Sequence, residues 1–138
     1  MLHKYNYVTL KKIIKIYTED KMKIYTGKLS NEKVGGQKII VKENDRQYLL
    51  PHIERHSPDG FNWGYGGSGP ADTALSILAD CVGIDQANQL YQTFKWDFVS
   101  GWGSEWSITE EEIREWIGKE EGPKENKERS KSWLLLRN

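Results

Sequence analysis

The feature of this chain that most constrains its fold is the segment from His56 to Pro70, HSPDGFNWGYGGSGP. Five of its fifteen residues are glycine and three are aromatic, and it leads directly into a helical pattern. Glycine reaches positive φ at low cost and lets another backbone or a ligand approach closely. This composition predicts a tightly turned backbone of fixed shape that presents rings and amide groups.

Short apolar runs in the first half of the chain predict an antiparallel sheet of about three strands. The expected strands cover residues 22–28, 37–43 and 46–50, with a turn at 44–45 between the last two. Residues 57–60, Ser-Pro-Asp-Gly, have the composition of a type I turn. Another short strand is expected over 61–65, directly before the glycines.

The second half of the chain has the apolar spacing of helices. The first helix is expected to start at a cap on Gly69, with Pro70 as its first residue, and to end at Gly83. The second is expected to start at a cap on Asp85 and to end near Gly101.

A third helix has the clearest start signal. Thr109 and Glu112 have the spacing of a capping box, and Ile108 and Ile113 that of a hydrophobic staple. We expect this helix to end at Gly118. The chain is therefore predicted to be an α+β domain, in which a small antiparallel sheet packs against three C-terminal helices.

The domain is expected to cover residues 22–118. Residues 15–18, KIYT, recur at 23–26, and Met22 stands just before the second copy, so residues 1–21 are interpreted as an N-terminal extension. Residues 119–138 are mostly charged and are predicted to form a flexible tail with an apolar end, WLLL, at 133–136.

The charges are unevenly distributed although the whole chain has a formal net charge of zero. Residues 22–118 have nine basic and fourteen acidic side chains, a net charge of −5. This excess of acidic groups argues against duplex nucleic acid as the main partner.

The cysteine content and hydropathy indicate the compartment. Cys81 is the only cysteine, which excludes an internal disulfide and a cysteine-rich zinc site. No apolar run is long enough to cross a bilayer, and no signal peptide is recognisable. We therefore expect a cytoplasmic protein with no membrane association.

The central segment resembles the signature HSPxGFxWGYGGSGPA of a small domain family of unknown function found in bacteria, archaea, phages and plasmids. Matching elements lie at 23–27 (KIYTG), 56–71 (the signature), 90–95 (LYQTFK) and 106–109 (WSIT). The resemblance covers about residues 22–118. It implies no established activity and therefore no catalytic residues. The presence of such domains on mobile elements implies an accessory role, in conflict with a host or in maintenance of the element.

The aromatic–glycine segment supplies the candidate ligand-binding residues: Trp63, Tyr65, Gly66, Gly67 and Ser68. Backbone N–H groups before a helix favour phosphate, and aromatic rings can stack on a base. Asp72, in the first turn of the helix, would oppose a phosphate there. The structural alternative is that the glycines permit a tight turn while the rings pack into the core.

Polar side chains gather just before the glycines: His52, His56, Ser57 and Asp59. Two histidines four residues apart share a face only on a helix, and Pro51 and Pro58 bracket this pair, so no metal site is predicted. His56 and Asp59 are weak candidates for acid–base catalysis. The alternative is that they fix the turn through hydrogen bonds.

The spacing of the other tryptophans predicts which of them are buried and which are exposed. Trp106 and Trp116 flank the third helix and are expected to be buried. Trp96 and Trp102 lie off the apolar face of the second helix, so one of them is expected to be exposed. An exposed tryptophan is a preferred contact residue for a protein partner.

These features predict a non-enzymatic accessory protein without a cofactor that binds a protein partner through the aromatic–glycine segment. The alternative is a module that binds or sequesters a nucleotide or another phosphate ligand, with Trp63 and Tyr65 stacking on the base. A hydrolase-like enzyme that uses His56 and Asp59 is the third hypothesis.

Overall fold

The computed structural model describes residues 6–19, 22–31 and 36–122. The predicted apolar end of the tail, at 133–136, lies outside this range. Along the chain the elements are α1 (Tyr7–Glu19), β1 (Lys23–Lys28), β2 (Ile39–Glu43), β3 (Arg46–Leu49), α2 (Ser68–Val82), α3 (Ile84–Asp97), the 3-10 turn η2 (Val99–Gly101), β4 (Glu105–Thr109) and α4 (Glu110–Glu120).

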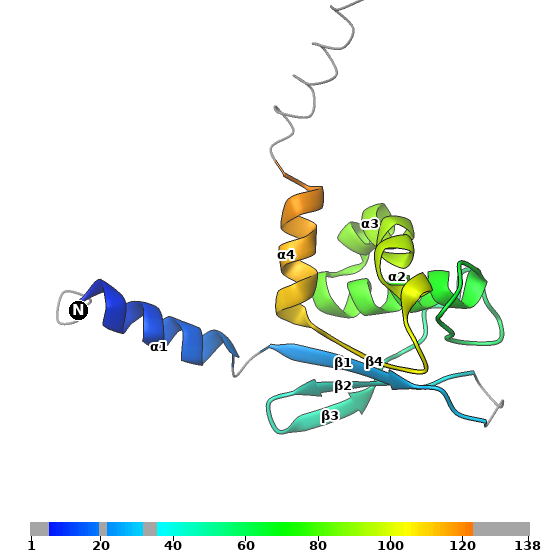
Figure 1. The fold of residues 1–138 in the computed structure, drawn as a ribbon, viewed down its shortest axis with the longest axis horizontal. Helices are drawn as coiled ribbons and strands as arrows, with labels where there is room; N and C mark the ends of the chain where they lie inside the picture. The colour runs from blue at the N-terminus through cyan, green and yellow to red at the C-terminus, as the bar shows by residue number, and fades with distance from the viewer. Residues whose placement is uncertain (1–5, 20–21, 32–35, 123–138) are drawn as a thin grey trace, which may run out of the picture.

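The described part of the chain is an α+β fold, as predicted. Four antiparallel strands form one sheet in the order β3-β2-β1-β4, and α2, α3 and α4 cover one of its faces (Figure 1). The predicted count of three strands is wrong by one. The fourth strand is β4, which comes from the second half of the chain and pairs with β1. Only the start of the following helix was recognised there.

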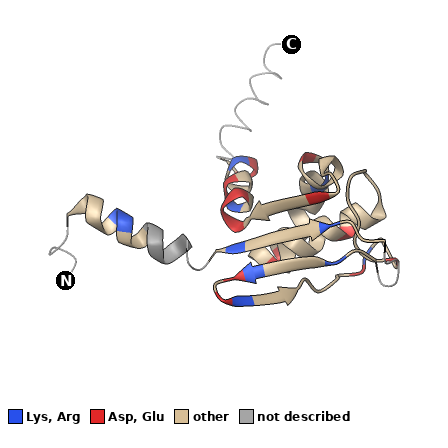
Figure 2. Ribbon diagram, turned by 60° about the horizontal axis from the view of Figure 1, so that its bottom comes forward, with Lys and Arg blue, Asp and Glu red and all other residues tan. Residues whose placement is uncertain are grey.

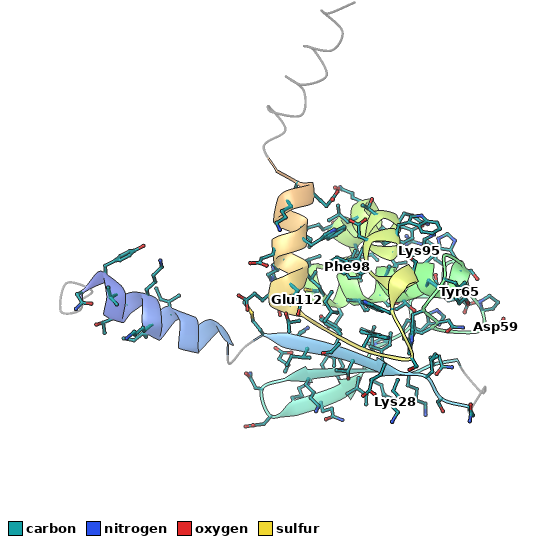
Figure 3. All side chains as sticks on the ribbon, viewed as in Figure 1. Lys28, Asp59, Tyr65, Lys95, Phe98 and Glu112 are labelled. Carbon is teal, nitrogen blue, oxygen red and sulfur yellow. The ribbon has the colours of Figure 1, made fainter. Side chains whose placement is uncertain are left out.

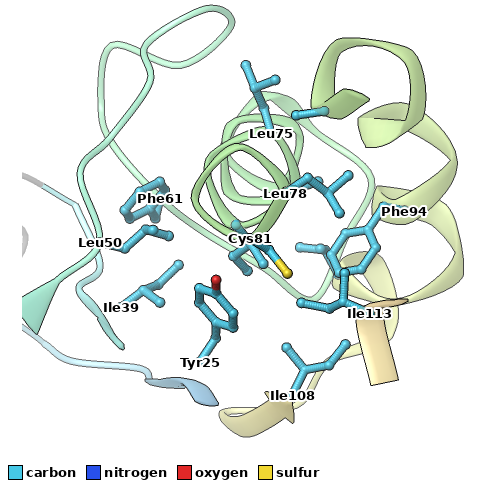
Figure 4. Close-up of a cluster of buried hydrophobic side chains, with 14 of the residues drawn as sticks. Tyr25, Ile39, Leu50, Phe61, Leu75, Leu78, Cys81, Phe94, Ile108 and Ile113 are labelled. Atoms are coloured by element: carbon cyan, nitrogen blue, oxygen red, sulfur yellow. The ribbon is translucent and has the colours of Figure 1, made fainter. Parts of the chain in front are cut away.

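Alternation along the strands directs one set of side chains to the helices. Tyr25 of β1 lies opposite Val41 of β2 and Ile108 of β4, and all three side chains are buried. Their neighbours in the strands are more exposed. Figure 4 shows Tyr25 and Ile108 beneath Leu78 of α2 and Phe94 of α3, so the sheet and helices share one core.

The predicted helices are present, with shifted starts. Helix α2 begins at Ser68 after the N-cap Gly67, so Pro70 is its third residue and not its first. Gly83 ends α2 with a φ of 93°, as the glycine signal predicted. Helix α3 follows directly, with Gly83 as its N-cap in place of the predicted Asp85.

The start of α4 confirms the capping prediction. The Thr109 hydroxyl oxygen accepts a hydrogen bond from the Glu112 N–H at 3.1 Å. The same hydroxyl lies 3.2 Å from the Glu112 carboxylate. Ile108 and Ile113, the predicted staple, are both buried. The helix continues to Glu120, two residues past the predicted end at Gly118.

The predicted strand over 61–65 does not form. Phe61 makes a single bridge with Gln37, and the backbone then turns. Gly60, before this segment, and Gly64, within it, have φ of 94° and 89°, which interrupts extended structure. The predicted turn over 57–60 is present, closed by the Gly60 N–H and the Ser57 carbonyl oxygen at 3.5 Å.

Helix α1 lies to one side of the two layers (Figure 1). Its first turn is capped by the Asn6 side-chain oxygen, which accepts a hydrogen bond from the Thr9 N–H at 2.8 Å. Tyr7 and Val8 are exposed. Within the described ranges, no helix combines the length and the apolar character needed to cross a membrane.

Candidate functional site

The Asp72 carboxylate organises the chain that leads into the aromatic–glycine segment. It is fully buried in α2 and accepts hydrogen bonds from the backbone N–H groups of Arg55, His56 and Ser57 at 2.9–3.3 Å. The His52 ring nitrogen Nε2 lies 2.9 Å from the same carboxylate. Asp72 therefore fixes residues 52–57 against α2.

These contacts decide the charge of Asp72. Burial alone would raise the pKa of its carboxyl group, but the hydrogen bonds from His52 and from the N–H groups of residues 57, 56 and 55 hold that pKa below its ordinary value. The carboxylate is therefore ionised at neutral pH, and its oxygens face the 52–57 segment.

The weak catalytic candidates His56 and Asp59 are not brought together. His56 is exposed, its Nε2 lies 2.9 Å from the Tyr91 hydroxyl, and its ring stacks on that of Tyr91. Within the described ranges, no hydrogen bond or ion pair joins His56 to Asp59. Nor does any group of three or more His, Cys, Asp or Glu residues there have the arrangement of a metal site.

Trp63, a candidate stacking residue, lies in the core. Its side chain is 3% exposed and meets the Trp106 ring edge-to-face at 5.3 Å between centroids. Trp106 in turn stacks on Trp102 at 3.8 Å. The Trp63 ring is thus enclosed and has no free face for a ligand. For this residue the structural alternative, core packing, describes the observed position.

Tyr65 and Trp96 form an exposed aromatic surface over the glycines. Their side chains are 49% and 61% exposed. A Cβ added to Gly66 would lie 2.2 Å from the Trp96 ring, and one added to Gly67 would lie 2.5 Å from the Tyr65 ring. The two rings therefore lie directly against the Gly66-Gly67 backbone, and we call these four residues the aromatic surface.

The backbone beneath the aromatic surface is anchored at both ends. The Gly64 N–H donates to the Val99 carbonyl oxygen at 3.0 Å. The Thr73 hydroxyl donates to the Asn62 carbonyl oxygen at 2.8 Å and lies 3.2 Å from the Asn62 nitrogen, whose N–H donates to it. These bonds hold the segment against η2 and α2.

Charged side chains lie at the start of α4 and beside the aromatic surface. Glu110, Glu111 and Glu112 fill the first turn of α4, where Figure 2 shows a group of acidic residues. Beside the aromatic surface, the Lys95 ammonium lies 4.5 Å from the centroid of the Trp96 ring. The Arg55 guanidinium donates to the Asn88 side chain on α3 and lies over the Tyr91 ring.

A second polar cluster joins the end of α2 to the sheet. The Asp80 carboxylate accepts hydrogen bonds from the Tyr25 hydroxyl at 2.7 Å, the Tyr48 hydroxyl at 3.0 Å and the Lys23 ammonium at 3.2 Å. Burial, the neighbouring Cys81 and Asp80 raise the pKa of Tyr25, which therefore stays a hydrogen-bond donor. Each member of the cluster has a partner, so we assign it a structural role.

The sequence predicts Tyr65, Gly66, Gly67 and Ser68 as site residues, whereas Trp96 is predicted only as one of two tryptophans of which one is exposed. Trp96 was recognised only as a residue off the apolar face of its helix, which left open where its ring lies. The contact with Gly66 depends on the packing of α3 against the segment. No local pattern encodes that packing.

Comparison with known proteins gives a family and no activity. A family model described as a family of unknown function (DUF6166) matches residues 25–119. Neither a curated protein nor a solved structure matches the chain. The matched range includes β2, β3, β4, α2, α3, the aromatic surface and all of β1 except its first two residues. The chain thus belongs to this family of unknown function, DUF6166.

Proposed function

We propose that this chain is a binding module, without a catalytic step of its own, that recognises a protein partner through the aromatic surface. The observation that carries the proposal is the exposure of Tyr65 and Trp96 on an anchored glycine backbone. Large aromatic side chains contribute much of the binding energy at protein interfaces, and rings held in place lose little entropy on binding.

The resemblance to domains of mobile elements gives this proposal its setting. The chain would act as an accessory protein of a phage or another mobile element, on a protein in the cytoplasm of the host. The hydrogen bonds around residues 62–64 support binding through the aromatic surface, because a surface that is already ordered can bind without a folding step.

The test is capture of a partner by the immobilised full chain from a lysate of the host cell. Wild-type protein is expected to retain a stoichiometric partner, and Trp96→Ala to weaken binding by about 30-fold or more, as at a hot spot. Leu49→Ala is the matched control, because Leu49 is 56% exposed on β3, away from the aromatic surface.

Gly66→Ala gives a second, independent test of the proposal. The new methyl group would displace the Trp96 ring without removing it, so partner capture should fall while the melting temperature changes little. Capture that persists undiminished in both Trp96→Ala and Tyr65→Ala would overturn the proposal.

A further inference from the structure

The two exposed rings of the aromatic surface are not paired with other rings. In the core, aromatic rings pack on one another, as Trp63 does on Trp106 and Trp106 on Trp102. Tyr65 and Trp96 belong to no ring pair among the described side chains, although they are 49% and 61% exposed. Ring surface that elsewhere in the domain is used for packing therefore remains available to a partner.

The rings lie on two successive glycines. An added Cβ on Gly66 would meet Cη2 and Cζ3, at the benzene end of the Trp96 indole, and one on Gly67 would meet the Cδ2–Cε2 edge of Tyr65. Gly66 is itself exposed, so the backbone between the rings has no side chain above it. A polyproline II helix advances about 3.1 Å per residue, so an extended segment of a few residues can touch both rings.

The side chains of this surface present hydrogen-bond donors. The Trp96 Nε1–H group can only donate, and it lies at the other end of the indole from the atoms that meet Gly66. Neither this group nor the Tyr65 hydroxyl forms a hydrogen bond with the described part of the chain. The Lys95 ammonium, 4.5 Å from the centroid of the Trp96 ring, adds further donors. Figure 3 shows Lys95 and Tyr65 at the same end of the molecule, so this end favours a ligand that supplies acceptors.

Charge narrows the choice of ligand. The positive charge of Lys95 beside the Trp96 ring disfavours a basic segment. Residues 22–118 have a net charge of −5, which disfavours an acidic segment or a free phosphate. The ligand that fits both conditions is uncharged, and its acceptors are backbone carbonyl groups.

We propose that the protein partner presents a proline-rich segment in the polyproline II conformation to the aromatic surface. Such a segment has no internal hydrogen bonds, so its carbonyl groups are free acceptors, and proline has no N–H that would need an acceptor. Proline-rich segments bind aromatic-lined sites in this preformed, low-entropy conformation. The inference rests on the proposed function, because it names the class of segment that the protein partner presents.

Calorimetric titration of the full chain with a capped decamer of proline tests the proposal. The proline decamer is expected to bind with a Kd of about 1 mM or less. A flexible glycine–serine decamer should bind at least about tenfold more weakly, because it must be ordered on binding. Tyr65→Ala and Trp96→Ala should each weaken binding of the proline decamer about tenfold or more. Leu49→Ala, on β3, is the control and should bind like wild type.

Trp96→Phe separates the ring from its donor and keeps the test decisive if Trp96→Ala alters the fold. Phenylalanine keeps an aromatic face but has no N–H group, so binding of the proline decamer should fall by about fivefold. Binding by Trp96→Phe that equals wild type would contradict the donor role given to Nε1 and overturn the proposal.

Competition in lysate capture distinguishes this inference from the proposed function. An excess of the proline decamer should displace the captured partner from the immobilised wild-type chain. A partner that is lost in Trp96→Ala but is not displaced by the decamer overturns the inference and leaves the proposed function standing. Failure of wild type to bind the decamer at millimolar concentration also overturns the inference. So does tighter binding of AMP than of the decamer, because the rings would then favour a base.

Discussion

At the scale of single residues, Asp72 does the most to shape the region around the aromatic surface. One carboxylate accepts three consecutive backbone N–H groups and contacts a histidine, so a segment without regular secondary structure is fixed to α2. The 52–57 segment has few hydrogen bonds of its own. Its conformation therefore depends on the charge and shape of this side chain.

Asp72→Asn is expected to lower the free energy of unfolding by about 2–4 kcal/mol at neutral pH, because an amide group presents donors where the carboxylate only accepts. Urea denaturation measures the change. Asp59→Asn, at an exposed carboxylate nearby, is the control and should leave stability unchanged. Equal stability of the two variants would contradict the role given to Asp72.

The same residue predicts a dependence of stability on pH. The folded protein lowers the pKa of Asp72 below its ordinary value of 3.8, so the ionised group stabilises the fold above that pH. This contribution is lost as the pH falls through the folded pKa. The stability difference between wild type and Asp72→Asn should therefore shrink below about pH 4 in urea titrations. A difference that stays constant with pH would show that the charge is not involved.

At the scale of elements, the chain before β2 is coupled to the turn over 57–60. Gly36 has a φ of +76°, and an added Cβ would lie 2.4 Å from the Asp59 carbonyl oxygen and 2.8 Å from the Gly60 Cα. Directly after it, Gln37 bridges to Phe61. The approach to β2 and the start of the aromatic–glycine segment therefore pack backbone against backbone.

Gly36→Ala is expected to destabilise the protein by about 2–4 kcal/mol, because it adds both a strained φ and a backbone clash. Gly103→Ala is the matched control, since its φ is not positive and nothing lies within 4 Å of the added atom. Thermal or urea unfolding of the two variants makes the comparison. Similar midpoints would mean that this backbone contact is not maintained in solution.

The elements that the sequence predicted well are those with local signals. The Thr109 cap, the glycine stop at Gly83 and the Asn44 turn depend on residues within a few positions of one another, and each is present. The sequence does not predict strand β4 because its last residue, Thr109, is itself the strong helix cap, and because its partner β1 is far away in the sequence. The strand expected at 61–65 does not form. Its aromatic residues favour a strand, but the positive φ of Gly64 is incompatible with extended backbone.

At the scale of the whole molecule, the core lies between the sheet and helices α2, α3 and α4. None of the described side chains of helix α1 belongs to that core. That residues 22–118 form a single domain stays a prediction. How the chain packs α3 against the aromatic–glycine segment is a property of this scale, which is why the sequence did not reveal the site of Trp96.

A fragment of residues 22–122 is expected to unfold cooperatively, with a melting temperature within a few degrees of the full chain. The reason is that none of the described side chains of α1 is buried in the core. Calorimetry of the fragment and the full chain provides the comparison. A loss of cooperative unfolding in the fragment would show that one of the removed ends is needed by the domain.

The position of β1 between β2 and β4 has a consequence for the nascent protein. One flank of β1 is paired as soon as the adjoining hairpin emerges from the ribosome, but its other flank waits until both intervening helices have been translated. Throughout that interval the backbone N–H and C=O groups on this flank of β1 have no hydrogen-bond partner in β4 and can pair with other polypeptides. Slow translation between these two points would therefore prolong the time in which the newly made chain is most prone to aggregate.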